Sequence, residues 1–139
     1  MSDQTFSELN EAESAWLASL LDELVAAGID LSPEDLSQYF DNEWGAWAAL
    51  AEDARPDPSA TITRIGAGVG AVVAERLGFG WGVVTDEYGS DLAIRGEIRE
   101  LTFFPISSVA KRWMSGDLGW IVPFVNWAIT SVEDARSTS

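Results

Sequence analysis

The stretch that decides the fold covers residues 81–112 and reads WGVVTDEYGSDLAIRGEIRELTFFPISSVAKR. Within it, residues 81–85 and 91–95 alternate between apolar and other side chains and flank a turn that contains Gly89. A third apolar run, residues 101–104, follows a second turn. Alternation with a period of two, interrupted by glycine-containing turns, predicts a three-stranded antiparallel meander.

Helical patterns precede the meander. Thr5 opens the first predicted helix, because Thr5 and Glu8 fit the capping box that begins many helices. A second pattern covers residues 33–53, which form either one helix or two because Gly45 weakens the middle. Residues 60–77 carry apolar side chains on one face and form a third, long helix.

Two further helices are expected after the meander. Pro105 ends the third strand, and Ser107 or Ser108 caps a short helix. The sequence therefore predicts an α+β fold with N-terminal helices, a long helix, the meander, and C-terminal helices packed on the sheet. Its 139 residues fit one domain. The predicted parts are an acidic helical region (1–58), an α-β-β-β-α core (59–117) and a C-terminal helix (118–135).

The charge of the chain is strongly negative and uneven. The formal net charge is −15, and residues 1–58 hold 14 acidic residues against one basic residue, Arg55. Residues 59–139 hold nine acidic and seven basic residues. Such a field repels nucleic acid and anionic membranes. It suits either solubility alone or binding to a basic protein partner.

The chain contains neither cysteine nor histidine. This composition excludes disulfides, zinc sites with Cys or His ligands, thiol nucleophiles and Ser-His-Asp triads. The N-terminus lacks the basic and apolar regions of a signal peptide, and no apolar run approaches the roughly 20 residues of a membrane span. A cytoplasmic protein without membrane contact is expected.

Residues 66–71 read GAGVGA and match the G-x-G-x-x-A outline of a dinucleotide-binding unit. The threonines and the arginine within residues 61–64 do not suit a buried parallel strand. The chain also turns back as a hairpin after Asp86, and too few residues remain for a doubly wound sheet. We therefore expect no nucleotide cofactor. Gly66 and Gly70 instead lie one turn apart on a helix that another element approaches closely.

The turn of the hairpin is acidic, with three carboxylates between Asp86 and Asp91. Such oxygen ligands suit Ca²⁺ or Mg²⁺, but the spacing lacks the EF-hand pattern, and no metal is expected. The alternative is hairpin chemistry, in which Gly89 is left-handed and Asp86 or Asp91 bonds turn amides.

Lys111 and Arg112 stand out because the chain has only eight basic residues. If their helix packs beside the hairpin, Arg112 pairs with Asp86 or Glu87. That contact is either a structural ion pair or the lining of a pocket. No catalytic residue is assigned. The candidate binding residues are Asp86, Glu87, Tyr88, Asp91, Lys111 and Arg112.

Two of the seven tryptophans, Trp44 and Trp47, lie in the acidic half of the chain. An exposed pair at this place would form a candidate surface for a protein partner. The alternative is that both rings belong to the core, as large aromatic side chains commonly do.

Three motifs occur in the same order and spacing as in a known family. They are Ile65-Gly66-x-x-x-Gly70, Trp81-x-Val83-Val84-x-Asp86-Glu87-Tyr88-Gly89 and Phe104-Pro105-x-Ser107-x-Val109-x-Lys111-Arg112. Over roughly residues 60–117 the chain resembles a bacterial family of uncharacterised proteins, domain-of-unknown-function family 3806. The resemblance implies that Gly66 and Gly70 lie on a helix, and it implies no catalytic residues.

The composition favours a non-enzymatic, acidic protein-binding module with a basic protein partner. Such a protein is similar in outline to secretion chaperones and toxin-immunity proteins. An open sheet edge or the tryptophan-bearing helices would also allow a homodimer. The alternative is a small-ligand-binding protein, or a carboxylate- or metal-dependent enzyme, whose site combines the acidic turn at residues 86–88 with Lys111 and Arg112.

Overall fold

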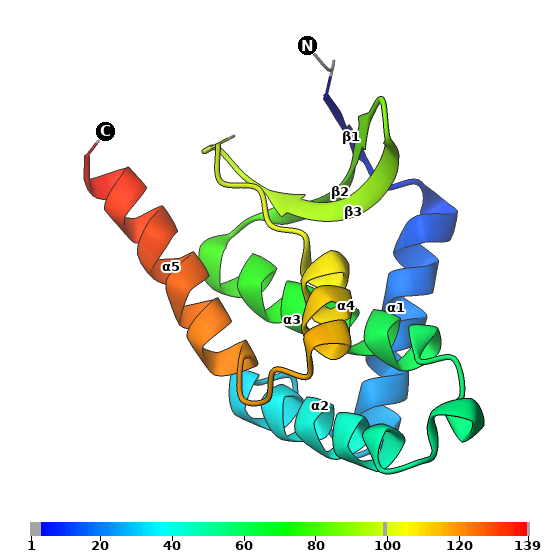
Figure 1. Ribbon diagram of the computed structural model, residues 1–139. Helices are drawn as coiled ribbons and strands as arrows, with labels where there is room; N and C mark the ends of the chain where they lie inside the picture. The colour runs from blue at the N-terminus through cyan, green and yellow to red at the C-terminus, as the bar shows by residue number, and fades with distance from the viewer. Residues whose placement is uncertain (1–3, 99, 139) are drawn as a thin grey trace.

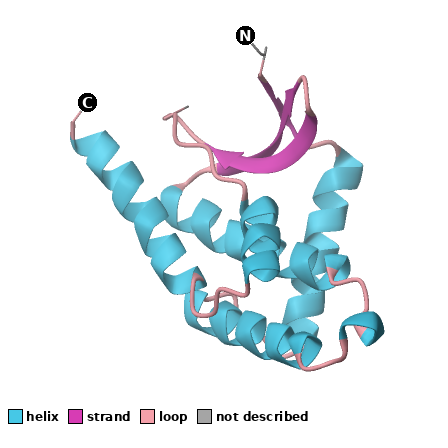
Figure 2. Ribbon diagram, viewed as in Figure 1, coloured by secondary structure: helices cyan, strands magenta, loops and turns pink. Residues whose placement is uncertain are grey.

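The computed structural model describes residues 4–98 and 100–138, and it confirms the α+β fold. Within these residues, five α-helices support one small antiparallel sheet (Figure 1). Figure 2 shows the sheet as a layer on one side of the helices. In chain order, the elements are β1 (Thr5–Glu8), α1 (Glu11–Ala26), α2 (Pro33–Ala48), the 3₁₀ turn η1 (Glu52–Ala54), α3 (Ser59–Leu77), β2 (Gly80–Asp86), β3 (Gly89–Arg95), α4 (Pro105–Ser115) and α5 (Ile121–Ser137).

β2 and β3 form the predicted hairpin. Their antiparallel register runs from Gly80 opposite Arg95 to Asp86 opposite Gly89. Gly89 has a φ of +133°, a conformation that strains any residue with a side chain, and this explains the glycine at the turn.

β1 pairs with the other edge of β2, in a register that places Thr5 opposite Thr85. The helix predicted from Thr5 is therefore wrong at its start, and α1 begins at Glu11. Its capping box joins Asn10 and Glu13: the Asn10 side chain accepts from the Glu13 amide at 2.7 Å, and the Asn10 amide donates to the Glu13 carboxylate at 2.9 Å. Both capping boxes are compatible with the local sequence, and the pairing with β2 selects the later one.

Residues 101–104, predicted as the third strand, do not form one. Phe103 makes a single bridge to Ile94, with N–O distances of 2.8 and 2.9 Å. Pro105 then opens α4. Proline favours the first turn of a helix and ends the extended segment after that one bridge. The serine cap predicted two or three residues later is therefore also wrong.

The observed bounds of α2 and α5 also bear on the predictions: those of α2 decide between one helix and two, and those of α5 differ from the predicted range. α2 is one continuous helix, Pro33–Ala48, and residues 52–54 form a separate 3₁₀ turn. Ser32 caps α2 by accepting a hydrogen bond from the Asp35 amide at 3.2 Å. α5 begins at Ile121, later than the predicted residue 118, and continues beyond residue 135 to Ser137.

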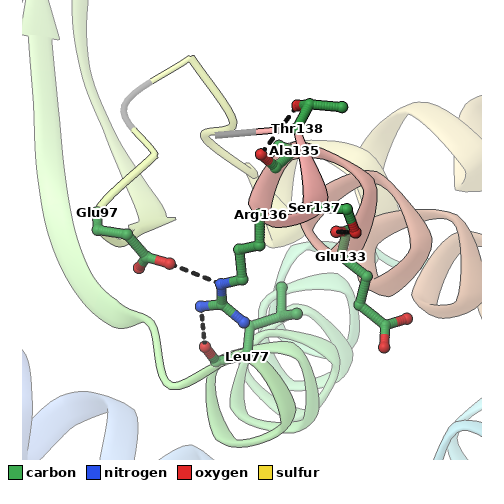
Figure 3. A network of polar contacts seen from close by, with 7 residues as sticks. All are labelled: Leu77, Glu97, Glu133, Ala135, Arg136, Ser137 and Thr138. Atoms are coloured by element: carbon green, nitrogen blue, oxygen red, sulfur yellow. Dashed lines mark hydrogen bonds and ion pairs between the residues drawn. The ribbon is translucent and has the colours of Figure 1, made fainter.

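Arg136 fixes the end of α5 to two other parts of the chain (Figure 3). Its Nε donates to the Glu97 carboxylate at 2.7 Å, and its Nη2 donates to the carbonyl of Leu77 at 2.8 Å. The hydrogen bond from Arg136 lowers the pKa of Glu97. Since Leu77 ends α3 and Glu97 lies between β3 and α4, these contacts join three segments at one point.

α3 is the centre of the core and contacts the other four helices. Its glycines set the distances to two neighbours. A Cβ at Gly66 would lie 2.7 Å from the Cα of Ile106 in α4, and a Cβ at Gly70 would overlap the Trp81 ring in β2. The prediction that both glycines lie on a helix approached closely by another element is confirmed.

Arg64 of α3 connects the first three helices. Its Nη1 donates to the hydroxyl of Tyr39 in α2 at 3.1 Å, and its Nη2 lies 3.6 Å from the carboxylate of Glu23 in α1. Burial raises the pKa of the Tyr39 phenol, and the neighbouring Arg64 acts against that shift.

Tyr39 is expected to titrate above the ordinary tyrosine pKa of about 10. Since the chain has two tyrosines, a Tyr88→Phe variant isolates Tyr39, and its tyrosinate absorbance can be followed against pH. The raised pKa means that the folded state favours the neutral phenol. The contribution of Tyr39 to the free energy of unfolding is therefore complete below about pH 10, and it is lost as the pH rises through the folded pKa. A midpoint at or below the ordinary value would contradict the half-buried position of this ring.

Candidate functional site

An open cleft crosses the outer face of α4, between the β2–β3 turn and the start of α5. Its volume is about 950 Å³. In Figure 1, α4 lies below the sheet and to the right of α5. α4 buries Pro105, Val109 and Trp113 at a spacing of four residues, and its opposite stripe faces the cleft. The residues that form this floor are Phe104, Ser107, Ser108, Lys111 and Arg112.

The wall on the sheet side carries the acidic residues. Asp86 accepts a hydrogen bond from the amide of Tyr88 at 2.8 Å, as expected for an aspartate in a tight turn. Asp91 accepts a hydrogen bond from the hydroxyl of Ser107, which fixes this wall to α4. Each contact uses one carboxylate oxygen, so the other remains available to a ligand. The residues of this wall are Gln4, Val84, Asp86, Tyr88, Gly89, Ser90 and Asp91.

The wall on the α5 side is aromatic. Trp120, Phe124 and Trp127 line the cleft together with Pro123. The rings of Trp120 and Phe124 lie 5.5 Å apart, and those of Phe124 and Trp127 lie 6.0 Å apart. Trp127 is 57% exposed. Trp120 is buried in the core, so the exposed part of this wall comes from the α5 side chains after it. The spacing of four and three residues between these aromatic side chains is the sequence signal that indicates a shared surface.

Arg112 does not pair with the hairpin acids as predicted. Its Nη1 donates to the Asp117 carboxylate at 2.8 Å, and its guanidinium lies 5.8 Å from the centre of the Trp120 ring. Gly116, with a φ of +69°, ends α4 and turns the chain so that Asp117 comes back beside Arg112. Asp86 is satisfied locally by a turn amide, which removes the need for a distant partner.

Lys111 has no carboxylate within ion-pair distance among residues 4–98 and 100–138. Its side chain is exposed and lines the cleft. The same part of the chain contains no group of three or more acidic residues that could hold a metal ion. Within the described part of the chain, the cleft thus combines one ammonium group that has no carboxylate partner with two hydrogen-bonded carboxylates.

Five of the six candidate binding residues line this cleft: Asp86, Tyr88, Asp91, Lys111 and Arg112. The sixth, Glu87, is exposed at the turn and lies outside the lining. The structure therefore brings the acidic turn and the Lys-Arg pair to one place, as walls and floor of a cleft, without the direct ion pair between them.

Trp44 and Trp47 are half-buried and do not form an exposed pair. The Trp44 Nε1 donates to the carbonyl of Trp113 at 3.0 Å, and the Trp47 Nε1 donates to the carbonyl of Pro56 at 2.8 Å. The guanidinium of Arg55 lies 5.0 Å from the centre of the Trp47 ring. Both rings therefore hold α2 against its neighbours, and their surfaces are largely committed to the fold.

The family model described as "Domain of unknown function (DUF3806)" matches residues 46–124, more than half of the chain. The chain belongs to this family. The DUF3806 match extends the resemblance over residues 60–117 in both directions and includes most of the cleft, from Val84 to Phe124. No curated protein and no solved structure matches the chain significantly. Among the described residues, none of the helices has the length and apolar content required to cross a bilayer.

Proposed function

We propose that the protein is a non-enzymatic binding module that holds a basic segment of a protein partner in the cleft across α4. The observation that carries this function is the pairing of an acidic wall with an aromatic wall in a chain of net charge −15. The proposal includes a bacterial cytoplasmic location, which would bring the protein into contact with intracellular basic partners.

The two walls suit lysine and arginine side chains. Asp86 and Asp91 each have a carboxylate oxygen that can accept a charge-assisted hydrogen bond from an ammonium or guanidinium group. The faces of exposed aromatic rings attract the same groups, and Tyr88 and Trp127 are 88% and 57% exposed. A basic side chain that enters between the walls therefore meets favourable partners on both sides.

The charge of the whole molecule supports the same class of partner. Residues 1–58 carry 14 acidic residues and one basic residue, so a strong negative field extends from the N-terminal helices. Such a field raises the association rate of basic partners and weakens as the salt concentration rises. The chain has no histidine or cysteine for acid-base or nucleophilic catalysis, which favours binding over an enzymatic reaction.

Selection of random peptides displayed on phage would test this function. The native protein is expected to enrich peptides that combine Lys or Arg with apolar residues, and the double variant Asp86→Asn with Asp91→Asn is expected to lose that enrichment. Asparagine retains the oxygen atoms that accept from Tyr88 and Ser107, so the fold should persist.

A matched double variant, Asp22→Asn with Asp53→Asn, removes the same charge from exposed positions outside the cleft. It should retain the selected peptides with little change in affinity. Enrichment of acidic or uncharged peptides by the native protein would contradict the proposal, as would equal losses in the two double variants.

A small organic anion is the second candidate ligand, because Lys111 lacks a carboxylate partner among the described residues. The cleft volume of about 950 Å³ also falls within the range of roughly 300–1,000 Å³ for small-molecule sites. Lys111→Met would abolish the binding of such an anion, whereas the Asp86→Asn and Asp91→Asn pair would improve it. The opposite response of the acidic variants separates the two functions.

A further inference from the structure

We infer, on the basis of the proposed function, that the cleft captures the free C-terminus of a partner chain. The terminal carboxylate would bind Lys111 and Arg112 on the floor, and a basic side chain shortly before it would bind Asp86 and Asp91 on the sheet-side wall.

The floor of the cleft contains the donors that a carboxylate requires. Lys111 presents an ammonium group without a carboxylate partner in the described parts of the chain. Arg112 uses one guanidinium nitrogen on Asp117, which leaves other N–H groups of its planar fork for a second acceptor. Ser108 also lines this floor and lies three residues before Lys111, on the same face of α4.

The spacing of Asp91 and Lys111 along the cleft fits a peptide that has a basic residue close to its C-terminus. Ser107 contacts Asp91, and Lys111 follows Ser107 by four residues on α4. Residues four apart on a helix have Cβ atoms about 5–6 Å apart. An extended chain advances about 3.3–3.6 Å per residue. The basic residue should therefore stand one or two positions before the C-terminal residue.

The aromatic wall supplies a place for an apolar terminal side chain. Trp120, Phe124 and Trp127 line the cleft on the side of α5, across from the acidic wall. A terminal Leu or Phe can cover the accessible parts of Phe124 and Trp127 while its carboxylate lies on the floor. The cleft thus provides distinct partners for a charge of each sign and for an apolar group.

Charge distinguishes a chain terminus from a free small anion. A free anion must approach a protein of net charge −15 against repulsion. A carboxylate carried by a basic segment belongs to a molecule with no net negative charge, so its approach is not opposed. The same field that favours a basic segment therefore also allows its terminal carboxylate to reach Lys111.

Fluorescence anisotropy with two forms of one peptide would test the inference. The probe is a short labelled peptide that ends in Arg-Ala-Leu, prepared as the free acid and as the C-terminal amide. The native protein should bind the acid about tenfold more tightly than the amide, the effect of one charge-assisted contact. Lys111→Met should bind the two forms with a much smaller difference, because Arg112 is then the only cationic group left on the floor. Arg76→Gln, which removes one exposed positive charge outside the cleft, should preserve the difference.

The single lysine of the chain gives an independent readout. The free-acid peptide should protect Lys111 from acetylation, measured by mass spectrometry, and the amide should protect it less. Equal affinity of acid and amide for the native protein would overturn the terminal-carboxylate inference while leaving the proposed function in place. Failure of both forms to bind, together with no selection of basic peptides on phage, would overturn both.

Discussion

Replacing Trp113 by alanine is expected to lower the free energy of unfolding by about 3–5 kcal/mol. Trp113 is 2% exposed, and its ring packs edge-on against Phe40 and Trp47 with ring centres 5.5 Å apart in both pairs. Its backbone carbonyl also accepts the hydrogen bond from Trp44. Loss of this side chain would leave a large cavity between α4 and α2, and such a loss is a large part of the 5–15 kcal/mol of a typical protein.

Urea unfolding followed by circular dichroism would measure this effect without relying on tryptophan fluorescence. Trp16→Ala is the matched control, since Trp16 is 44% exposed on α1 and should cost less than about 1 kcal/mol. Trp113→Phe should be milder than Trp113→Ala, because it keeps most of the volume and removes an indole N–H that has no partner among the described residues. Similar losses for Trp113→Ala and Trp16→Ala would contradict the packing.

Replacing Gly66 by alanine is expected to destabilise the protein by about 1–3 kcal/mol, although alanine is the better helix former. The new Cβ would lie 2.6 Å from Cγ1 and 2.7 Å from Cα of Ile106. The second of these is a backbone atom, so the clash cannot be relieved by a change of rotamer, and α4 would have to move away from α3. Because α4 is the floor of the cleft, ligand binding should weaken as well.

Gly45 provides the control with the opposite sign. It lies within α2 and has no atom within 4 Å of the Cβ that alanine would add. Gly45→Ala should therefore stabilise the protein by about 0.5–1 kcal/mol through helix propensity alone. Thermal unfolding of the two variants would separate the effects, and a shift of both melting temperatures in the same direction would contradict the close contact between α3 and α4.

Local chemistry explains why the β2–β3 hairpin could be predicted and the strand β1 could not. The β2–β3 pairing depends on alternation and on Gly89, which are properties of neighbouring residues. The position of β1 depends on the pairing of Thr5 with Thr85, and the residues around Thr5 give no indication of this distant partner. The capping box at Thr5 is as acceptable as the one at Asn10, and only the sheet distinguishes them.

The sequence indicated which residues belong to the candidate site, but it did not indicate which of them contact each other or which are exposed. Asp86 and Lys111 were identifiable as rare or turn-forming charges, and the structure places both in one cleft. The partner of Arg112 was missed because Gly116 reverses the chain and makes Asp117 the nearer acid. Trp127 was missed because an aromatic residue on a helix is usually buried, and its exposure depends on what packs beside it.

The position of β1 has a consequence for the order in which the protein folds. Its partner strand lies far away along the chain, since Thr5 pairs with Thr85. Closing so long a loop costs entropy before any hydrogen bond forms, so β1 should join last and detach first. The helices α1, α2 and α3 lie between β1 and β2 in the sequence. During synthesis, β1 can therefore pair with β2 only after the residues of all three helices have been made. The wall of the cleft that contains Gln4 would then be the last part to assemble.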